Sequence, residues 1–88
     1  INYPPFFTPN QDGYNDTWNI IGGDQLVNAK IYIFDRYGKL LKQISPNGEG
    51  WDGTYNGRPL PSTDYWFTIN YEENGTPKEF KAHFSLKR

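Results

Sequence analysis

The residues best suited to chemistry lie together near the start of the chain, at positions 10–16, which hold two carboxylates, two asparagine amides and one glycine. Oxygen ligands at alternate positions around a glycine are typical of a Ca²⁺-binding loop, and the candidate ligands are Asn10, Asp12, Tyr14 and Asp16. An EF-hand register fits poorly, because its first and last ligand positions hold a threonine and an asparagine. The alternative is a pair of Asx-turns, in which these side chains accept hydrogen bonds from backbone N–H groups. The pattern favours the Asx-turns.

Residues for catalysis are scarce. The chain has one histidine, His83, and no cysteine. None of the serines Ser45, Ser62 and Ser85 lies in a nucleophile-elbow context. No glycine-rich phosphate loop follows a strand and opens a helix. Apart from the candidate Ca²⁺ loop the sequence predicts no cofactor, and we expect no enzyme activity.

Charge and hydropathy narrow the range of partners. Nine Lys and Arg against ten Asp and Glu leave a net charge of −1, and no basic run occurs before Lys87–Arg88. A nucleic-acid-binding protein would carry a basic stripe to neutralise phosphates, so no nucleic-acid partner is expected. No apolar run approaches the roughly 18–20 residues of a membrane span. The start at Ile1, without Met, predicts a fragment of a longer precursor.

Strand signals dominate the elements that must position these residues. Apolar and polar residues alternate in two segments around Asn74–Gly75, the strongest short hairpin signal, and Gly38 suits a second turn. The predicted strands cover residues 17–21, 29–34, 40–44, 54–55, 65–72 and 80–87. No window shows a sustained helical period, so helix is at most a single turn. The sequence predicts one all-β domain, an Ig-like antiparallel β-sandwich of about seven short strands.

Aromatic residues make up 18% of the chain, which has two interpretations. Large rings close a small core with few residues, because each buries roughly 150–250 Å². Exposed rings can instead form a stacking platform for sugars. The rings considered for such a platform are Trp18, Trp51, Trp66, Tyr14, Tyr37 and Tyr55. Core packing is the simpler explanation for most of them.

Four segments and the end of the chain match the motifs of one family. Residues 7–17 read FTPNQDGYNDT, 33–38 IFDRYG, 51–53 WDG and 60–65 LPSTDY, and FSLKR closes the chain at 84–88. In order and spacing they resemble the F-[ST]-P-N-G-D-G-x-N-D opening, the IF-[ND]-R-[WY]-G turn, the WDG, the LP-x-G-x-Y and the basic ending of the gliding-motility-associated C-terminal domain. That family is also called the type B sorting domain of the type IX secretion system of Bacteroidetes. The resemblance covers nearly the whole chain.

The departures from the family pattern are small. Gln11 stands where the family usually has glycine, from which we expect that this position does not need positive φ. Thr63 stands where a glycine often precedes the tyrosine of the LP motif. Neither change removes a charged or aromatic residue of the pattern.

The resemblance implies a sorting role for residues 1–88. Such domains form the extreme C-terminus of large secreted or surface proteins and are read by the outer-membrane type IX translocon after export to the periplasm. The implied partners are this translocon, a dedicated type B outer-membrane partner and the N-terminal cargo attached to the domain, which itself is expected to be a monomer. The implied route passes through the periplasm and ends at the cell surface or outside.

The positions carried over from the motifs are the candidates for translocon recognition. They are Asn10, Asp12, Gly13, Asn15, Asp16, Asp35, Arg36, Gly38, Trp51, Asp52, Gly53, Leu60, Pro61, Tyr65, Lys87 and Arg88. Turn chemistry and core closure explain the same residues equally well, and Asp35 with Arg36 is alternatively an ion pair that fixes its hairpin. The second function considered is a Ca²⁺-stabilised Ig-like adhesion or carbohydrate-binding module.

Overall fold

The two longest strands come from the segments in which apolar and polar residues alternate most regularly. In the computed structural model, which describes residues 1–88, β6 spans Asp64–Glu73 and β7 spans Thr76–Leu86. Asn74 and Gly75 join them with φ of 53° and 76°, the positive values that a tight two-residue hairpin requires. The predicted hairpin is therefore confirmed, and both strands extend further than the pattern indicated.

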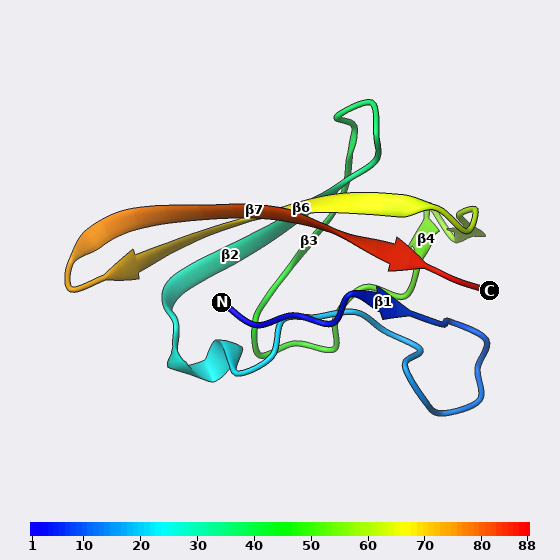
Figure 1. Ribbon diagram of the computed structural model, residues 1–88, viewed down its shortest axis with the longest axis horizontal. Coiled ribbons are helices and arrows are strands. Elements are labelled where there is room, and N and C mark those ends of the chain that lie inside the picture. The colour runs from blue at the N-terminus through cyan, green and yellow to red at the C-terminus, as the bar shows by residue number, and fades with distance from the viewer.

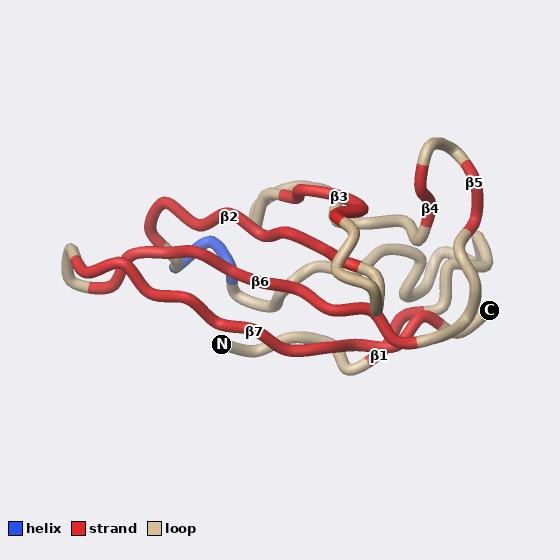
Figure 2. The backbone as a smooth tube through the Cα atoms, turned by 90° about the horizontal axis from the view of Figure 1, so that it is seen from above, coloured by secondary structure: helices blue, strands red, loops and turns tan.

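Three more strands complete the main sheet, in the order β1-β7-β6-β2-β3. They are β1 at Phe6–Phe7, β2 at Val27–Phe34 and β3 at Leu40–Ile44. Strands β2 and β3 form the second predicted hairpin, and Gly38 in its turn has φ of 83°. A separate hairpin pairs β4, Thr54–Tyr55, with β5, Arg58–Pro59, and it projects from one end of the molecule (Figure 2).

The sequence predicted a wholly antiparallel sheet, and this prediction was wrong at β1. Strand β1 runs parallel to β7, whereas every other pair in the sheet is antiparallel. Beside β1, the N–H groups of Ser85 and Lys87 donate to the carbonyls of Pro5 and Phe7 over 2.9 and 3.0 Å. The segment that opens the chain lies in the layer that covers the sheet. Its strand β1 runs in the same direction as β7, toward the C-terminus, so the two strands are parallel (Figure 1).

Extended segments form the layer that covers the sheet (Figure 1). The predicted strand at residues 17–21 was wrong as a continuous strand, because only single bridges join Trp18 to Trp51 and Asn2 to Ile21. Between them the Asn19 side-chain amide donates to backbone carbonyls of the 45–48 turn, the nearest at 3.0 Å. This side chain ties the two segments together where a strand ladder would otherwise run. One 3-10 turn, Gly23–Gln25, is the single helical element.

Aromatic rings fill the space between the layers. Trp18 is fully buried and stacks on Phe84, with ring centroids 4.1 Å apart and planes 9° apart. Trp51 is 1% exposed and meets Tyr65 edge to face at 5.1 Å. Both indole N–H groups donate at 2.9 Å to backbone carbonyls, so neither is left unsatisfied by burial.

Burial also decides the interpretation of the aromatic residues. Core packing is confirmed for Trp18 and Trp51, which therefore belong to no sugar platform. Trp66, Tyr14 and Tyr37 are exposed, and Tyr55 is half-buried. No helix in the structure is long and apolar enough to span a membrane.

Candidate functional site

The guanidinium group of Arg88 joins three of the motif segments. Its Nε donates to the carbonyl of Leu60 at 2.9 Å, Nη1 to that of Pro9 at 3.3 Å, and Nη2 to that of Gly53 at 3.1 Å. The backbone N–H of Arg88 donates to Ser62 Oγ at 3.0 Å. Because a guanidinium presents five donors in a rigid plane, one side chain fixes three carbonyls of separate loops. We call this set of contacts the Arg88 clamp.

The WDG segment fits the clamp because Gly53 has no side chain. Gly53 is buried with φ of 82°, and a Cβ there would lie 2.9 Å from Leu86 Cδ1 and 3.3 Å from Pro9 Cγ. Its carbonyl also accepts the Leu60 N–H at 2.9 Å. Next to it, Asp52 Oδ1 accepts hydrogen bonds from the N–H and hydroxyl of Thr54 at 3.1 and 2.7 Å, which begins β4. Asp52 and Gly53 therefore shape this loop.

Residues 10–16, which we call the acidic loop, are held by hydrogen bonds from backbone N–H groups to side chains of the same loop. The two oxygens of Asp16 accept the N–H groups of Gln11 and Gly13, both at 2.9 Å. Asn10 accepts the N–H of Asp12 at 3.2 Å, and Asp12 accepts that of Tyr14 at 2.8 Å. These are the predicted Asx-turns. No group of three or more His, Cys, Asp or Glu stands together in a geometry for a metal, and the Ca²⁺ alternative stays a hypothesis.

The expectation for Gln11 was wrong, because its φ is 64°. Gly13 at 86° and Asn15 at 53° share this left-handed conformation, so the loop needs positive φ at three positions within five residues. The bond from the Gln11 N–H to Asp16 holds the glutamine in a conformation that glycine adopts more easily.

The DRYG turn is fixed by Asp35, without an ion pair to its neighbour. Asp35 Oδ1 accepts the N–H groups of Tyr37 and Lys39, both at 2.9 Å. Arg36 donates to the Tyr37 hydroxyl at 2.7 Å, and its guanidinium carbon lies 4.9 Å from the centre of that ring. The ion-pair alternative is wrong, since the two side chains make different contacts, and Gly38 closes the turn by donating its N–H to the Asp35 carbonyl at 3.0 Å.

A groove of about 370 Å³ joins this turn to the LPSTDY segment. Its floor and walls contain Leu41, Leu60, Pro61 and Tyr65. The Tyr65 hydroxyl donates to the Pro61 carbonyl at 2.8 Å, which bends the segment back over the ring. Burial raises the pKa of the Tyr65 phenol above its ordinary 10.0, while the charge of Arg88 lowers it and that of Asp35 raises it. We call this depression the turn groove.

A second depression, of about 450 Å³, lies between the acidic loop and the β4–β5 hairpin that follows the WDG segment. Its lining includes Asp16, Asp52 and Arg88. Lys87, the other basic residue at the end, is exposed, and its Nζ lies 4.6 Å from the centre of the Phe6 ring. Residues of all four motifs thus line two depressions, which the hydrogen bond from Arg88 to Leu60 connects. The candidates on the turn groove are Asp35, Arg36, Leu60, Pro61 and Tyr65, and those on the second depression are Gly13, Asp16, Asp52 and Arg88. The other candidates, Asn10, Asp12, Asn15, Gly38, Trp51, Gly53 and Lys87, line neither.

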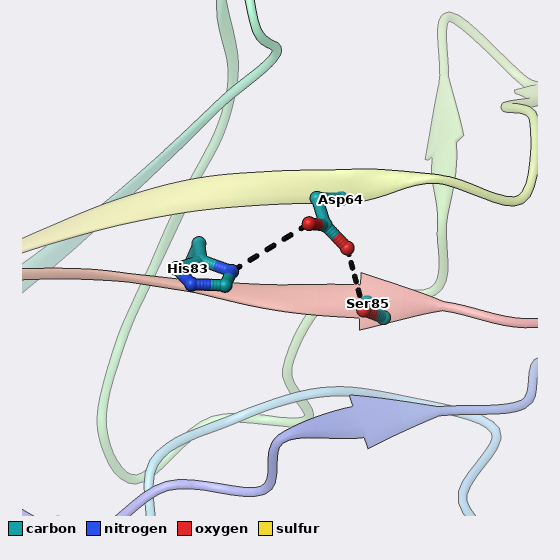
Figure 3. A network of polar contacts seen from close by, with 3 residues as sticks. All are labelled: Asp64, His83 and Ser85. Atoms are coloured by element: carbon teal, nitrogen blue, oxygen red, sulfur yellow. Dashed lines mark hydrogen bonds and ion pairs between the residues drawn. The ribbon is translucent and has the colours of Figure 1, made fainter.

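One polar network was not anticipated from the sequence. On the strands β6 and β7, Asp64 lies between Ser85 and His83 (Figure 3). The Ser85 hydroxyl donates to Asp64 Oδ1 at 2.6 Å, and His83 Nδ1 lies 3.7 Å from Asp64 Oδ2. A catalytic triad places histidine between serine and carboxylate, so that the imidazole removes the hydroxyl proton. Here the carboxylate occupies the middle, and His83 makes no hydrogen bond to the Ser85 hydroxyl.

Comparison with known families decides the relationship. The chain matches the family described as CHU_C Type IX secretion signal domain over residues 1–86. The chain belongs to this family. No curated protein matches it. As a type IX secretion signal domain it belongs to a family of export signals, which is not a catalytic family, and membership implies interaction with the type IX machinery and export to the cell surface or outside.

Proposed function

We propose that residues 1–88 form a single C-terminal sorting domain that directs the cargo joined to its N-terminal side through the type IX outer-membrane translocon. Membership of the secretion signal family over residues 1–86 supports this role. In this proposal the precursor reaches the periplasm first, and the folded domain is recognised there as a monomer. A dedicated type B outer-membrane partner takes part in recognition.

We further propose that the surface around the two depressions is the part that is read. The observation that carries this proposal is the Arg88 clamp, which holds loops at Pro9, Gly53 and Leu60 in one arrangement. Three loops far apart in sequence then present a surface of fixed shape, and preorganisation lowers the conformational cost of binding. The DRYG turn borders the same surface through the turn groove.

The domain acts by binding and carries out no reaction in this proposal. The unanticipated Ser85–Asp64–His83 network supports this interpretation, because the Ser85 hydroxyl donates a hydrogen bond to Asp64, its cross-strand neighbour, and joins β6 to β7. Such a network stabilises the end of the hairpin beside the turn groove, where Asp64 is part of the lining.

Export of a reporter tests the function. Residues 1–88 are fused to the C-terminal side of a periplasm-directed fluorescent protein in a gliding Bacteroidete. We expect the reporter outside the outer membrane of wild-type cells and in the periplasm of a type IX translocon mutant. Retention in wild-type cells would refute the sorting role, and export in the mutant would refute the type IX route.

A further inference from the structure

The turn groove combines an apolar floor with a cation that has no carboxylate partner in the fold. We propose that it receives an apolar side chain from the protein that reads the domain, and that a carboxylate of the same partner segment binds Arg36. This inference rests on the proposed function and adds the chemistry of the partner. It identifies the occupant as a short acidic and apolar peptide segment.

The floor of the groove is fixed and apolar. Leu41 and Tyr65 belong to the buried core, so they do not move aside when a ligand enters. The Tyr65 hydroxyl is already bound to the Pro61 carbonyl, and this leaves little hydrogen-bonding capacity on the floor for a polar ligand. A groove of about 370 Å³ is small, and it suits one anchoring side chain better than a long ligand.

The rim of the groove carries one cation with free donors. Arg36 is exposed and uses its guanidinium for one hydrogen bond, to the Tyr37 hydroxyl. No carboxylate lies within 4.0 Å of its guanidinium, since the two close pairs of acidic and basic side chains, Lys81 with Glu79 and His83 with Asp64, join other residues. A guanidinium has five N–H donors and binds a carboxylate through two parallel hydrogen bonds. Arg36 is thus prepared for a carboxylate that this chain does not supply.

The carboxylates that line the groove do not satisfy Arg36. Asp35 accepts two backbone N–H groups of its own turn. The carboxylate of Asp64 is directed toward β7, where Ser85 and His83 contact it (Figure 3). Both acids keep their negative charge, because the backbone N–H and hydroxyl groups that bind them are neutral, and Arg36 is the one charged residue of the lining with free hydrogen-bond donors.

A peptide fits this arrangement better than an anionic lipid surface. Recognition of anionic membranes uses clusters of about 4–8 Lys or Arg, whereas the turn groove is lined by one arginine and two aspartates. The net charge of the chain is −1, which gives no general attraction to a polyanion. One carboxylate beside one apolar side chain matches the free donors of Arg36 and the size of the groove.

The first test uses the reporter fusion with substitutions at Arg36 and a matched control. The variants are Arg36→Lys, Arg36→Gln, Arg36→Glu and, at the distant β6–β7 hairpin, Lys78→Glu. We expect export to fall about tenfold for Arg36→Gln, the equivalent of about 1.4 kcal/mol in binding. The fall should be larger for Arg36→Glu and smaller for Arg36→Lys, which keeps the charge without the planar fork. Lys78→Glu should export at the wild-type rate, because Lys78 is exposed and in no ion pair.

The fold must stay intact for this comparison. Arg36 is exposed and makes its one side-chain hydrogen bond to Tyr37, so we expect each purified variant to melt within about 2 °C of the wild type. Equal export rates of the wild-type and Arg36→Glu fusions would overturn the inference. That result would not contradict the sorting function. Failure of the wild-type fusion itself would instead refute the sorting function.

The second test identifies the occupant. A photoreactive amino acid replaces Tyr37 on the rim, which is 79% exposed, and the cross-linked peptide is sequenced from cells that export the fusion. We expect a segment of an outer-membrane type IX component in which Asp or Glu lies beside an apolar residue. A cross-link to lipid, a cross-link to a segment without a carboxylate, or no cross-link from an exported fusion would each overturn the inference.

Discussion

Replacing Arg88 should loosen three loops at once, and this is the most direct physical test of the clamp. Arg88→Ala removes hydrogen bonds of 2.9, 3.1 and 3.3 Å to the carbonyls of Leu60, Gly53 and Pro9. Hydrogen bonds that involve a charged group contribute about 1.5–3 kcal/mol each when shielded from water. Arg88 is exposed, so water replaces part of each bond, and we expect a total loss of about 1–2 kcal/mol.

The assay is thermal and urea unfolding of the purified domain. For a domain of this size, about 1 kcal/mol corresponds to a fall of about 4–8 °C in the melting temperature, so the expected fall is roughly 4–16 °C. Arg88→Lys should recover less than half of it, because one ammonium group does not reach three carbonyls in different directions. Lys87→Ala is the control, since Lys87 lies over the Phe6 ring and outside the clamp.

The clamp also predicts where the structure changes. In amide NMR spectra, Arg88→Ala should shift signals near Pro9, Gly53 and Leu60 together, because each carbonyl loses the same donor. Changes confined to the C-terminal residues would refute the reasoning. A melting temperature equal to that of Lys87→Ala would refute it as well.

Four further predictions concern the loops and the groove. Gly50→Ala should cost more than about 2 kcal/mol, because its Cβ would lie 2.5 Å from a main-chain oxygen, whereas Gly57→Ala, also at positive φ but in open space, should cost about 1 kcal/mol in the same urea assay. Tyr65→Phe should lose about 1 kcal/mol at pH 8 through its hydrogen bond. Burial raises the pKa of Tyr65, so its neutral form stabilises the wild type fully below pH 10 and less as the pH rises through the folded pKa. The difference in unfolding free energy between wild type and Tyr65→Phe should therefore narrow above pH 10. A difference that stays constant would contradict this. Asp35→Ala should lower the unfolding free energy by about 1–2 kcal/mol, and Asp35→Asn by less because it keeps an acceptor oxygen for the two turn N–H groups, an order that equal losses would disprove. Because the carboxylates of the Asn10–Asp16 loop bind its own N–H groups, adding Ca²⁺ and then EDTA should leave the melting temperature unchanged, and a rise with Ca²⁺ would demonstrate a site.

Local patterns predicted most of the fold. The alternation around Asn74–Gly75 indicated the β6–β7 hairpin, because a period of two places every second side chain on one face and the dipeptide supplies positive φ. The pattern was wrong at residues 17–21, where the Asn19 side chain takes over bonds to the backbone of a turn that lies more than 25 residues away in sequence. No local signal distinguishes such a residue from one in a strand.

The site was predicted as a set of motifs but not as an arrangement. Arg88 was a candidate, yet its three acceptors are backbone carbonyls 28, 35 and 79 residues away, which no side-chain type reveals. The interpretation of Gln11 failed because a carboxylate five positions on stabilises positive φ in a residue that rarely adopts it. Ser62 and the Asp64 network escaped notice for a similar reason, since their partners lie on other segments.

If the motif-bearing end of the domain carries the sorting signal, changes there should block export and changes at the other end should not. Two triple-alanine fusions test it, each changing three exposed residues and leaving the Arg88 clamp intact. The motif-end variant changes Tyr14, Tyr37 and Thr63, and the distal variant changes Glu73, Thr76 and Lys78. With both domains shown to be folded, we predict that the motif-end fusion stays in the periplasm while the distal fusion is exported at the wild-type rate. Export of the motif-end fusion at the wild-type rate would contradict the claim that the sorting signal lies at this end of the domain.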